Sequence, residues 1–272
     1  MQPSTLSNPP IHFVQPKGSS HRSAILLHGW GQNHRSLLGV AELLTGSLNP
    51  FVLDLPGFGT SPPPGLDHAG RAWGTLDYAR RLVGFMDANN LRSTTVIGHS
   101  YGGRVAVQLA AHFPDRIDSI VLIDAAGLPP QRPPALRFGL YLIKLGARLL
   151  ARTPNWLGGR LRGWYISKVA SSDYQQASPE LRPVLVNAVN ENLALEAGRV
   201  GCPVLLIWGE RDAVTPLEMG QRYQRLLKNS TLVVVPDGDH FPFLGKRADV
   251  CASHITRFVE KTNPSPSSRA IA

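Results

Sequence analysis

The feature that most constrains the fold is an alternation between short apolar runs rich in β-branched residues and longer stretches with helical periodicity. Several of the apolar runs have no polar face, which is typical of strands covered on both sides in a parallel sheet. This alternation predicts an α/β fold, with a mostly parallel central sheet and helices on both faces. The expected strands span residues 11–15, 23–28, 50–54, 93–99, 118–124, 203–208 and 231–235, and the expected helices span 33–46, 72–89, 101–113, 216–228 and 246–261. Thr215 is expected to cap the fourth of these helices, with Pro216 in its first turn.

One interval, residues 127–200, interrupts the alternation. It contains no convincing strand, and its helical patterns are separated by Pro and Gly, as in PPQRPP and RTPNWLGG. We therefore expect a helical lid inserted between two strands of one core, which residues 11–126 and 201–261 would form. The terminal segments 1–10 and 262–272 are rich in Pro and Ser and are expected to be disordered tails.

Composition limits the protein class. Of the 272 residues, 43% are hydrophobic and 17% are charged, which fits a globular protein. No apolar run approaches the roughly 18 residues of a membrane span, and the N-terminus lacks the basic start and apolar core of a secretory signal. Cys202 and Cys251 lack the spacing of a zinc or redox site, so we expect two ordinary buried thiols and a cytoplasmic location.

The net charge of +9 is concentrated in the expected lid. Eight of the basic residues, and no acidic one, lie between Leu128 and Val169: Arg132, Arg137, Lys144, Arg148, Arg152, Arg160, Arg162 and Lys168. At helical spacing, four of them would lie along one stripe of a helix: Arg137, Lys144, Arg148 and Arg152. Such a stripe is typical of a solvated face or of a weak contact with an anionic membrane surface. No nucleic-acid-binding module is recognisable, so we expect a small-molecule substrate and no nucleic-acid partner. The oligomeric state is left open.

Polar motifs follow five of the expected strands. These motifs are HGWGQ (28–32), DLPGFGTS (54–61), Ser100, GERDAVTP with Asp212, and PDGDHF with His240. Because ligands bind beyond the carboxyl ends of the strands in an open α/β sheet, we expect the five motifs to meet on one rim.

Ser100 lies in Gly98-His99-Ser100-Tyr101-Gly102, between an expected strand and an expected helix. A tight turn from strand to helix strains the serine backbone, and side chains at the two flanking glycine positions would collide with neighbouring backbone. The turn lifts the hydroxyl clear of the sheet at a helix N-terminus, where N–H groups point toward developing negative charge.

With HGWG, DLPGFGTS, GHSYGG and the pair WGERDAVTP and GDH, residues 20–260 resemble the α/β-hydrolase superfamily, in its lidded branch of esterases and carbon–carbon bond hydrolases. The resemblance implies that Ser100 is the nucleophile, His240 the base and Asp212 the acid that orients the base. It also implies an oxyanion hole made by the backbone N–H groups of Trp30 and Tyr101.

Other residues have competing interpretations. Asp124 ends a strand at a position from which some family members supply the acid, although the GERDAVTP context favours Asp212. His28 and His99 are expected to hold loop backbone rather than to act as bases, and Asp54 is expected to order its loop. The substrate is expected to contact Trp30, Tyr101, Phe138, Tyr141 and Phe241, and these aromatic side chains favour a hydrophobic acyl or aromatic substrate.

Three functions remain. The first is hydrolysis of a carboxylic ester through an acyl-enzyme, with no metal or organic cofactor. The second is hydrolysis of a carbon–carbon bond in a vinylogous diketone, in which a lid arginine such as Arg160 or Arg162 would hold a substrate carboxylate. The third is a catalytically idle binding protein, which has no chemical need for all three triad residues. Serine at position 100 argues against dehalogenase and epoxide hydrolase chemistry, because those reactions use an aspartate nucleophile.

Overall fold

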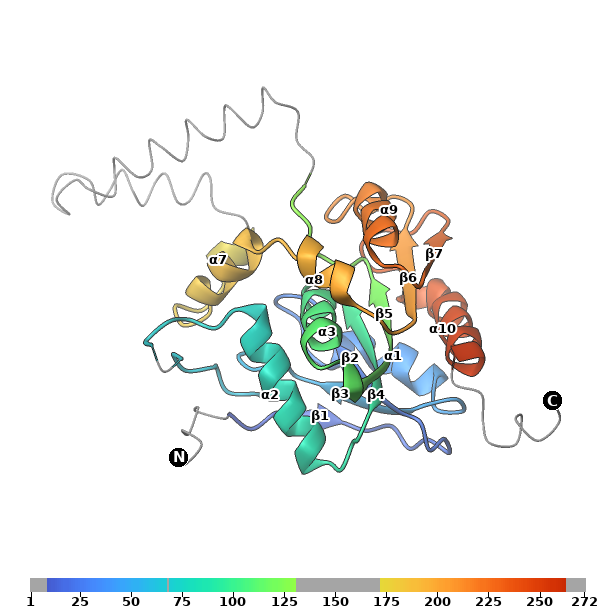
Figure 1. Ribbon diagram of the computed structural model, residues 1–272, viewed down its shortest axis with the longest axis horizontal. Helices are drawn as coiled ribbons and strands as arrows, with labels where there is room; N and C mark the ends of the chain where they lie inside the picture. Colours follow the sequence, from blue (N-terminus) through green and yellow to red (C-terminus); the bar gives the residue numbers. More distant parts are fainter. Residues whose placement is uncertain (1–8, 68, 131–171, 263–272) are drawn as a thin grey trace, which may run out of the picture.

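The computed structural model describes residues 9–67, 69–130 and 172–262, which form one central sheet with helices on both faces (Figure 1). The sheet has the order β1-β3-β2-β4-β5-β6-β7. Only β1 is antiparallel to its neighbour, and every other pair is parallel. The strands are β1 (Phe13–Val14), β2 (Ser23–Leu27), β3 (Asn49–Leu53), β4 (Thr94–His99), β5 (Ile117–Ile123), β6 (Val204–Gly209) and β7 (Ser230–Val235). The predicted fold class is therefore confirmed, and each predicted strand is present.

Two helical layers cover the sheet. The helices α1 (Arg35–Leu43) and α10 (Ala248–Thr262) pack on one face. The opposite face is covered by α2 (Thr75–Ala88), α3 (Tyr101–His112), α8 (Ala194–Arg199) and α9 (Leu217–Leu226). Short 3-10 turns at Pro114–Arg116 and Gly245–Arg247 lead into β5 and α10.

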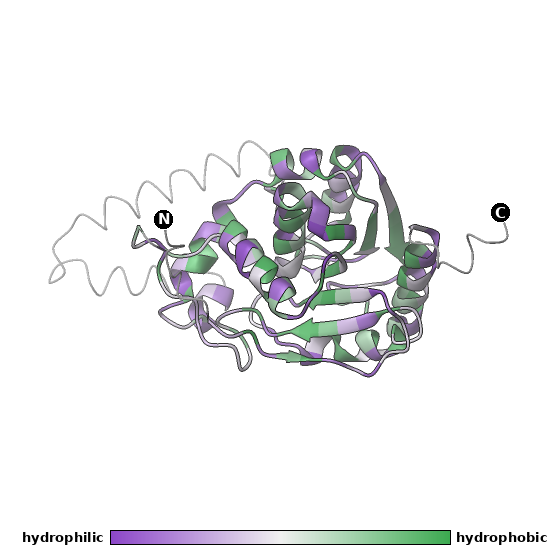
Figure 2. Ribbon diagram, turned by 60° about the horizontal axis from the view of Figure 1, so that its bottom comes forward, coloured by the Kyte–Doolittle hydropathy of each residue, from purple (hydrophilic) through white to green (hydrophobic). Residues whose placement is uncertain are grey.

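The strand sequences explain this layering. Along β2, Ala24 and Leu26 face the layer of α1 and α10, whereas Ile25 and Leu27 face the layer of α2 and α3. Alternate side chains of a strand point to opposite faces, so a strand covered on both sides needs apolar residues at every position. Figure 2 shows the result, with hydrophobic strands in the interior and helices that carry mixed colours.

The interval predicted to be a lid is described in part. Residues 172–200 contain α6 (Ser172–Gln176), α7 (Arg182–Asn190) and α8, and no strand is found in 127–130 or 172–200. The remainder, with the basic stripe and the aromatic residues Phe138 and Tyr141, lies outside the described residues, as do the two terminal tails apart from 9–10 and 262.

Three further expectations can be checked. In the described ranges, no helix combines the length and the apolar character needed to cross a bilayer. Cys251 is buried and Cys202 is half-buried, and both are free thiols. The predicted cap of α9 is wrong, because Pro216 occupies the N-cap position and makes no side-chain cap. The hydroxyl of Thr215 is instead directed to two aspartates at the end of the sheet.

Candidate active site

Ser100 lies at the turn between β4 and α3, with a backbone conformation that serine rarely adopts. Its φ is 50° and its ψ is −106°, a combination outside the regions populated by ordinary residues and one that costs roughly 1–3 kcal/mol. Hydrogen bonds hold the turn in place: the Ser100 N–H donates to Ile123 O at 3.1 Å, and the Ser100 carbonyl accepts from Ala126 N at 3.1 Å. The local strain is therefore supported by the end of β5.

The two glycines that flank Ser100 are sterically required. A Cβ on Gly98 would lie 2.5 Å from Gly102 O, and one on Gly102 would lie 2.2 Å from Leu27 O. Both obstacles are backbone atoms, which cannot turn away as a side chain can. The steric explanation of the G-x-S-x-G pattern is thus confirmed for this chain.

His240 and Asp212 come together from the loops after β7 and β6. The His240 Nδ1–H donates to Asp212 Oδ2 at 2.8 Å, so the Nε2 of His240 is left free to exchange a proton. The side chain of His240 is 11% exposed and the carboxyl of Asp212 is fully buried. This is the geometry expected of a base held in one tautomer by a buried acid.

Four groups that can donate a hydrogen bond surround the carboxylate of Asp212. Its Oδ1 accepts from the N–H groups of Val214 at 2.7 Å and Thr215 at 3.0 Å, and its Oδ2 accepts from Thr215 Oγ1 at 2.6 Å and from His240. Burial by itself would raise the pKa of Asp212, but the hydrogen bonds from His240 and Thr215 outweigh it and lower that pKa below its usual value.

Ser100 and His240 are brought to the same edge of the sheet through His99, which directly precedes the serine. The His99 Nε2–H donates to the backbone carbonyl of His240 at 2.8 Å, and the two imidazole rings lie 4.8 Å apart. Within the described residues the Ser100 hydroxyl makes no hydrogen bond, to His240 or to another group. Such contacts are often long without substrate and tighten when it binds.

The predicted oxyanion donors, Trp30 and Tyr101, come from two different loops. Tyr101 is the first residue of α3, while Trp30 lies in a turn closed by Gln32 N donating to Gly29 O at 3.3 Å and Gly29 N donating to Gln32 Oε1 at 3.2 Å. Neither the Trp30 nor the Tyr101 backbone N–H donates to any group in the described part of the chain. Both N–H groups are therefore available to an incoming oxygen.

The predicted structural roles of His28, His99 and Asp54 are confirmed. His28 donates from Nδ1 to Gly29 O at 2.7 Å and accepts from Leu55 N at 3.0 Å. Burial lowers the pKa of His28 to about 4 and that of His99 to about 3, so both stay neutral near pH 7. The buried carboxylate of Asp54 accepts from the N–H groups of His34 at 2.7 Å and Thr60 at 3.0 Å.

The described aromatic residues predicted to contact substrate differ in exposure. Trp30 is partly buried and its ring packs edge-on against Phe58 and Tyr101, at centroid distances of 5.0 and 5.2 Å. The Tyr101 residue is only 3% exposed, so what it offers a ligand here is its backbone N–H. Phe241 is partly buried, 5.3 Å from the His240 ring.

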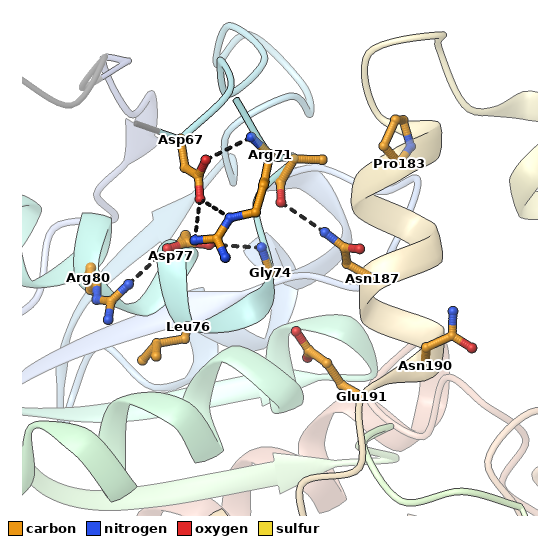
Figure 3. Close-up of a pocket in the computed structure, with 11 residues that line it drawn as sticks. Asp67, Arg71, Gly74, Leu76, Asp77, Arg80, Pro183, Asn187, Asn190 and Glu191 are labelled. Atoms are coloured by element: carbon orange, nitrogen blue, oxygen red, sulfur yellow. Dashed lines mark hydrogen bonds and ion pairs between the residues drawn. The ribbon is translucent and has the colours of Figure 1, made fainter. Parts of the chain in front are cut away.

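A cavity of about 330 Å³ lies beside Trp30 and the loop that follows β2. Trp30, Gln32 and Phe58 line its inner side, and Ala177 and Leu181, which follow α6, line the other. A larger groove of about 690 Å³ lies elsewhere, between the start of α2 and α7 (Figure 3). Its lining includes the Asp67–Arg71 ion pair but none of the predicted site residues, whereas the lining of the smaller cavity includes Trp30.

Two groups of three side chains in the described ranges have the proximity of metal ligands: His12, His34 and Asp54, and Asp124, Asp212 and His240. In the first group both carboxylate oxygens already accept hydrogen bonds, and in the second the carboxylate of Asp212 does. Asp54 accepts five, including one from Nδ1 of His12 and one from Nδ1 of His34, each at 2.9 Å. These side chains are therefore arranged to satisfy each other.

The role of Thr215 is the part of the site that sequence reasoning missed. Its hydroxyl lies 2.6 Å from Asp212 Oδ2 and 3.3 Å from His240 Nδ1. The available signal was the three-residue spacing from Asp212, because a threonine at that distance can direct both its N–H and its hydroxyl to one carboxylate.

Comparison with known proteins finds esterases among the relatives of this chain. The chain is 30% identical over 256 residues to the pimeloyl-[acyl-carrier protein] methyl ester esterase of Neisseria meningitidis serogroup B, covering 88% of this chain and 93% of that protein. The corresponding esterase of Chromobacterium violaceum is 27% identical over 262 residues, covering 87% of this chain and 94% of that one.

Solved structures show the same fold. A membrane phospholipase A superimposes with a TM-score of 0.69 and 26% identity, covering 96% of this chain and 88% of that one. A meta-cleavage product hydrolase from Pseudomonas fluorescens superimposes with a TM-score of 0.68 and 20% identity, covering 94% and 96%. The model of the Alpha/beta hydrolase family matches residues 24–253, and the chain therefore belongs to that family.

Proposed function

We propose that the protein is a serine hydrolase that cleaves a carboxylic ester through an acyl-enzyme, with Ser100, His240 and Asp212 as the catalytic residues. The observation that carries the proposal is the His240–Asp212 hydrogen bond of 2.8 Å at the sheet edge that also bears the strained Ser100. Membership of the α/β-hydrolase family and the esterase relatives support it.

Each residue has one chemical task in this reaction. Oγ of Ser100 attacks the ester carbonyl carbon while its proton passes to Nε2 of His240, and the carbonyl π electrons move to the oxygen. The tetrahedral intermediate collapses, the bond to the alcohol oxygen breaks, and His240 returns the proton to the departing alcohol. Water then repeats the sequence on the acyl-serine and releases the acid. Asp212 stabilises the imidazolium ion in both halves.

The negative charge on the former carbonyl oxygen would be bound by the N–H groups of Trp30 and Tyr101. The Tyr101 N–H is at the N-terminus of α3, whose aligned peptide dipoles also favour an anion. Loss of one such donor typically lowers kcat by about a hundredfold to a thousandfold.

The cavity next to Trp30 supports a substrate with an apolar group. Trp30, Phe58 and Leu181 supply apolar surface, and Gln32 and Asn33 supply polar groups at one side. We therefore extend the proposal to esters of hydrophobic acyl or aromatic groups. The competing carbon–carbon hydrolysis needs a cation for the substrate carboxylate, and the arginines considered for that task, Arg160 and Arg162, lie outside the described residues.

A fluorophosphonate probe tests the nucleophile directly. We expect the native protein to be labelled, Ser100→Ala to be unlabelled, and the control Ser253→Ala, which changes an exposed serine of α10, to be labelled as the native protein is. Equal labelling of the native protein and Ser100→Ala would remove Ser100 as the nucleophile. An unlabelled native protein would favour the idle binding protein.

A substrate panel then tests the reaction. The panel contains p-nitrophenyl esters from acetate to laurate, a pimeloyl-[acyl-carrier protein] methyl ester and a ring-fission dienoate. We expect ester cleavage that depends on Ser100. Turnover of the dienoate with negligible ester cleavage would replace the proposal with carbon–carbon hydrolysis.

A further inference from the structure

A second buried carboxyl group, that of Asp124, lies beside the His240–Asp212 pair. Asp124 follows β5, is 0% exposed and has a φ of 43°. Its Oδ1 accepts from Gly209 N at 2.8 Å, whereas its Oδ2 is buried without a hydrogen-bond partner. Leaving a carboxylate oxygen buried and unpaired is costly, so this arrangement needs an explanation.

The proximity of Asp124 to Asp212 explains the unpaired oxygen. One oxygen of each carboxyl group and a ring nitrogen of His240 all lie within 4.8 Å of one another. Two ionised carboxylates at this separation in a buried site repel strongly, so one of them holds a proton. Apart from the Thr215 hydroxyl, which lies near both residues, Asp212 has three hydrogen-bond donors and Asp124 has one; the ionised form is therefore Asp212.

The electrostatic environment agrees with this assignment. Burial is the largest contribution and raises the pKa of Asp124 to about 9; the Gly209 N–H opposes this rise and the charge of Asp212 adds to it. The other titratable groups that face Asp124 are Asp239 and His240, from the loop after β7, and the Cys251 thiol of α10.

The hydroxyl of Thr215 provides a separate geometric argument. It lies 3.0 Å from Asp124 O and 2.6 Å from Asp212 Oδ2, but it has a single hydrogen and can donate to only one of them. A proton on Asp124 Oδ2 supplies the missing donor, because it can serve Asp212 when Thr215 donates to Asp124 O. Both acceptors are then satisfied together.

We propose that Asp124 is a positioning residue of the active site, a neutral carboxylic acid whose Oδ2 proton is directed to the Asp212 carboxylate and keeps it aligned with His240. This role rests on the proposed function, since it acts through the acid of the triad. Ionisation of Asp124 at alkaline pH places a second negative charge against Asp212 and removes the donor, so activity falls there.

Two substitutions of Asp124 test whether its role is to donate a hydrogen bond or to carry a negative charge. Asp124→Asn keeps the acceptor for Gly209 N and replaces the O–H donor with an N–H, so we expect kcat within about threefold of the native value and no alkaline decline. Asp124→Leu removes the donor, and we expect kcat to fall about tenfold with KM unchanged. Asp118→Asn, at the other end of β5, is the matched control and should leave activity and pH profile unchanged.

Infrared spectroscopy tests the proton without reference to activity. The native protein at pH 7 should show the carbonyl band of a protonated buried carboxylic acid, which disappears in Asp124→Asn and persists in Asp118→Asn. Absence of that band from the native protein, or its persistence in Asp124→Asn, overturns the proposal. So does a loss of kcat in Asp124→Asn as large as in Asp124→Leu. If no form cleaves an ester, the proposed function fails while the infrared result still decides the state of Asp124.

Discussion

Replacing Asp54 tests whether one buried carboxylate holds the loops that follow β2 and β3. Its side chain is 0% exposed and accepts hydrogen bonds from backbone N–H groups on both sides, His34 on Oδ1 at 2.7 Å and Thr60 on Oδ2 at 3.0 Å. Burial would raise the pKa of Asp54, but these bonds outweigh it and lower that pKa far below its usual range.

The cost of the substitution follows from those contacts. A hydrogen bond from an N–H group to a charged acceptor is worth about 1.5–3 kcal/mol. Asp54→Ala deprives two such groups, so we expect a loss of roughly 3–6 kcal/mol in the free energy of unfolding. Asp54→Asn retains one acceptor oxygen, and we expect about half of that loss. Since a domain is stable by only about 5–15 kcal/mol, the alanine variant should be close to unfolding at 25 °C.

The pH dependence has a definite sign. Because the folded pKa of Asp54 is depressed, its ionisation stabilises the folded protein fully above the unfolded value of about 4. That stabilisation is lost as the pH falls from there through the lower folded pKa. The difference between native protein and Asp54→Asn should therefore be constant above about pH 5 and shrink below about pH 4.

Urea unfolding followed by circular dichroism measures both effects. The control is Asp87→Asn, which removes a surface ion pair of 2.8 Å with Arg116 and should cost about 0–1 kcal/mol. If Asp54→Ala loses no more stability than this control, or if the native-to-Asn difference is the same at pH 3 and pH 7, the carboxylate does not hold the loops as described.

Three further predictions concern the residues nearest the reaction. Asp212→Asn should lower kcat for p-nitrophenyl acetate by about ten-thousandfold, because the wrong imidazole tautomer is favoured; a loss below tenfold would contradict the assigned role. Thr215→Val removes the hydroxyl that bridges Asp124 O and Asp212 Oδ2 and should lower kcat/KM about fivefold to tenfold in the same assay, whereas unchanged kinetics would make that hydroxyl dispensable. Gly102→Ala should cost more than about 3 kcal/mol in urea unfolding, because its Cβ would meet Leu27 O at 2.2 Å; Gly39→Ala, where nothing lies within 4 Å, should be neutral or stabilising, and equal behaviour of the two would refute the steric argument.

The sheet was predictable because burial on both faces leaves a strong pattern in the sequence. Strands such as β4 and β6 are buried at every position, so their apolar runs stand out from the amphipathic helices between them. The need for glycine at positions 98 and 102 was predictable for a different reason, since backbone geometry at a tight turn depends on local sequence.

The hydrogen bonds among Thr215, Asp124 and Asp212 were less predictable, because they depend on how deeply each side chain is buried and on contacts between distant segments. Threonine is a common N-cap residue, yet the hydroxyl of Thr215 is directed to Asp124 O and Asp212 Oδ2. A local rule assigned it to the helix because the competing acceptors are 91 and three residues away. Asp124 likewise resembles an alternative acid, but its carboxyl accepts from Gly209 N, whereas the carboxyl of Asp212 is the one that accepts from His240 Nδ1.

His28, His99 and His240 follow or end strands, and their burial indicates which of them can act as a base. A catalytic base must gain and return a proton during each turnover, which requires a charged state that the site can tolerate. His28 and His99 are 0% exposed, and burial depresses the pKa of each so far that the charged form is inaccessible near neutrality. His240 reaches partial exposure on the loop after β7, and its Nδ1 lies 2.8 Å from the Asp212 carboxylate. All three occupy similar positions in the sequence pattern, so the assignment of the base rests on where the loops place each ring relative to solvent and to the one ionised acid.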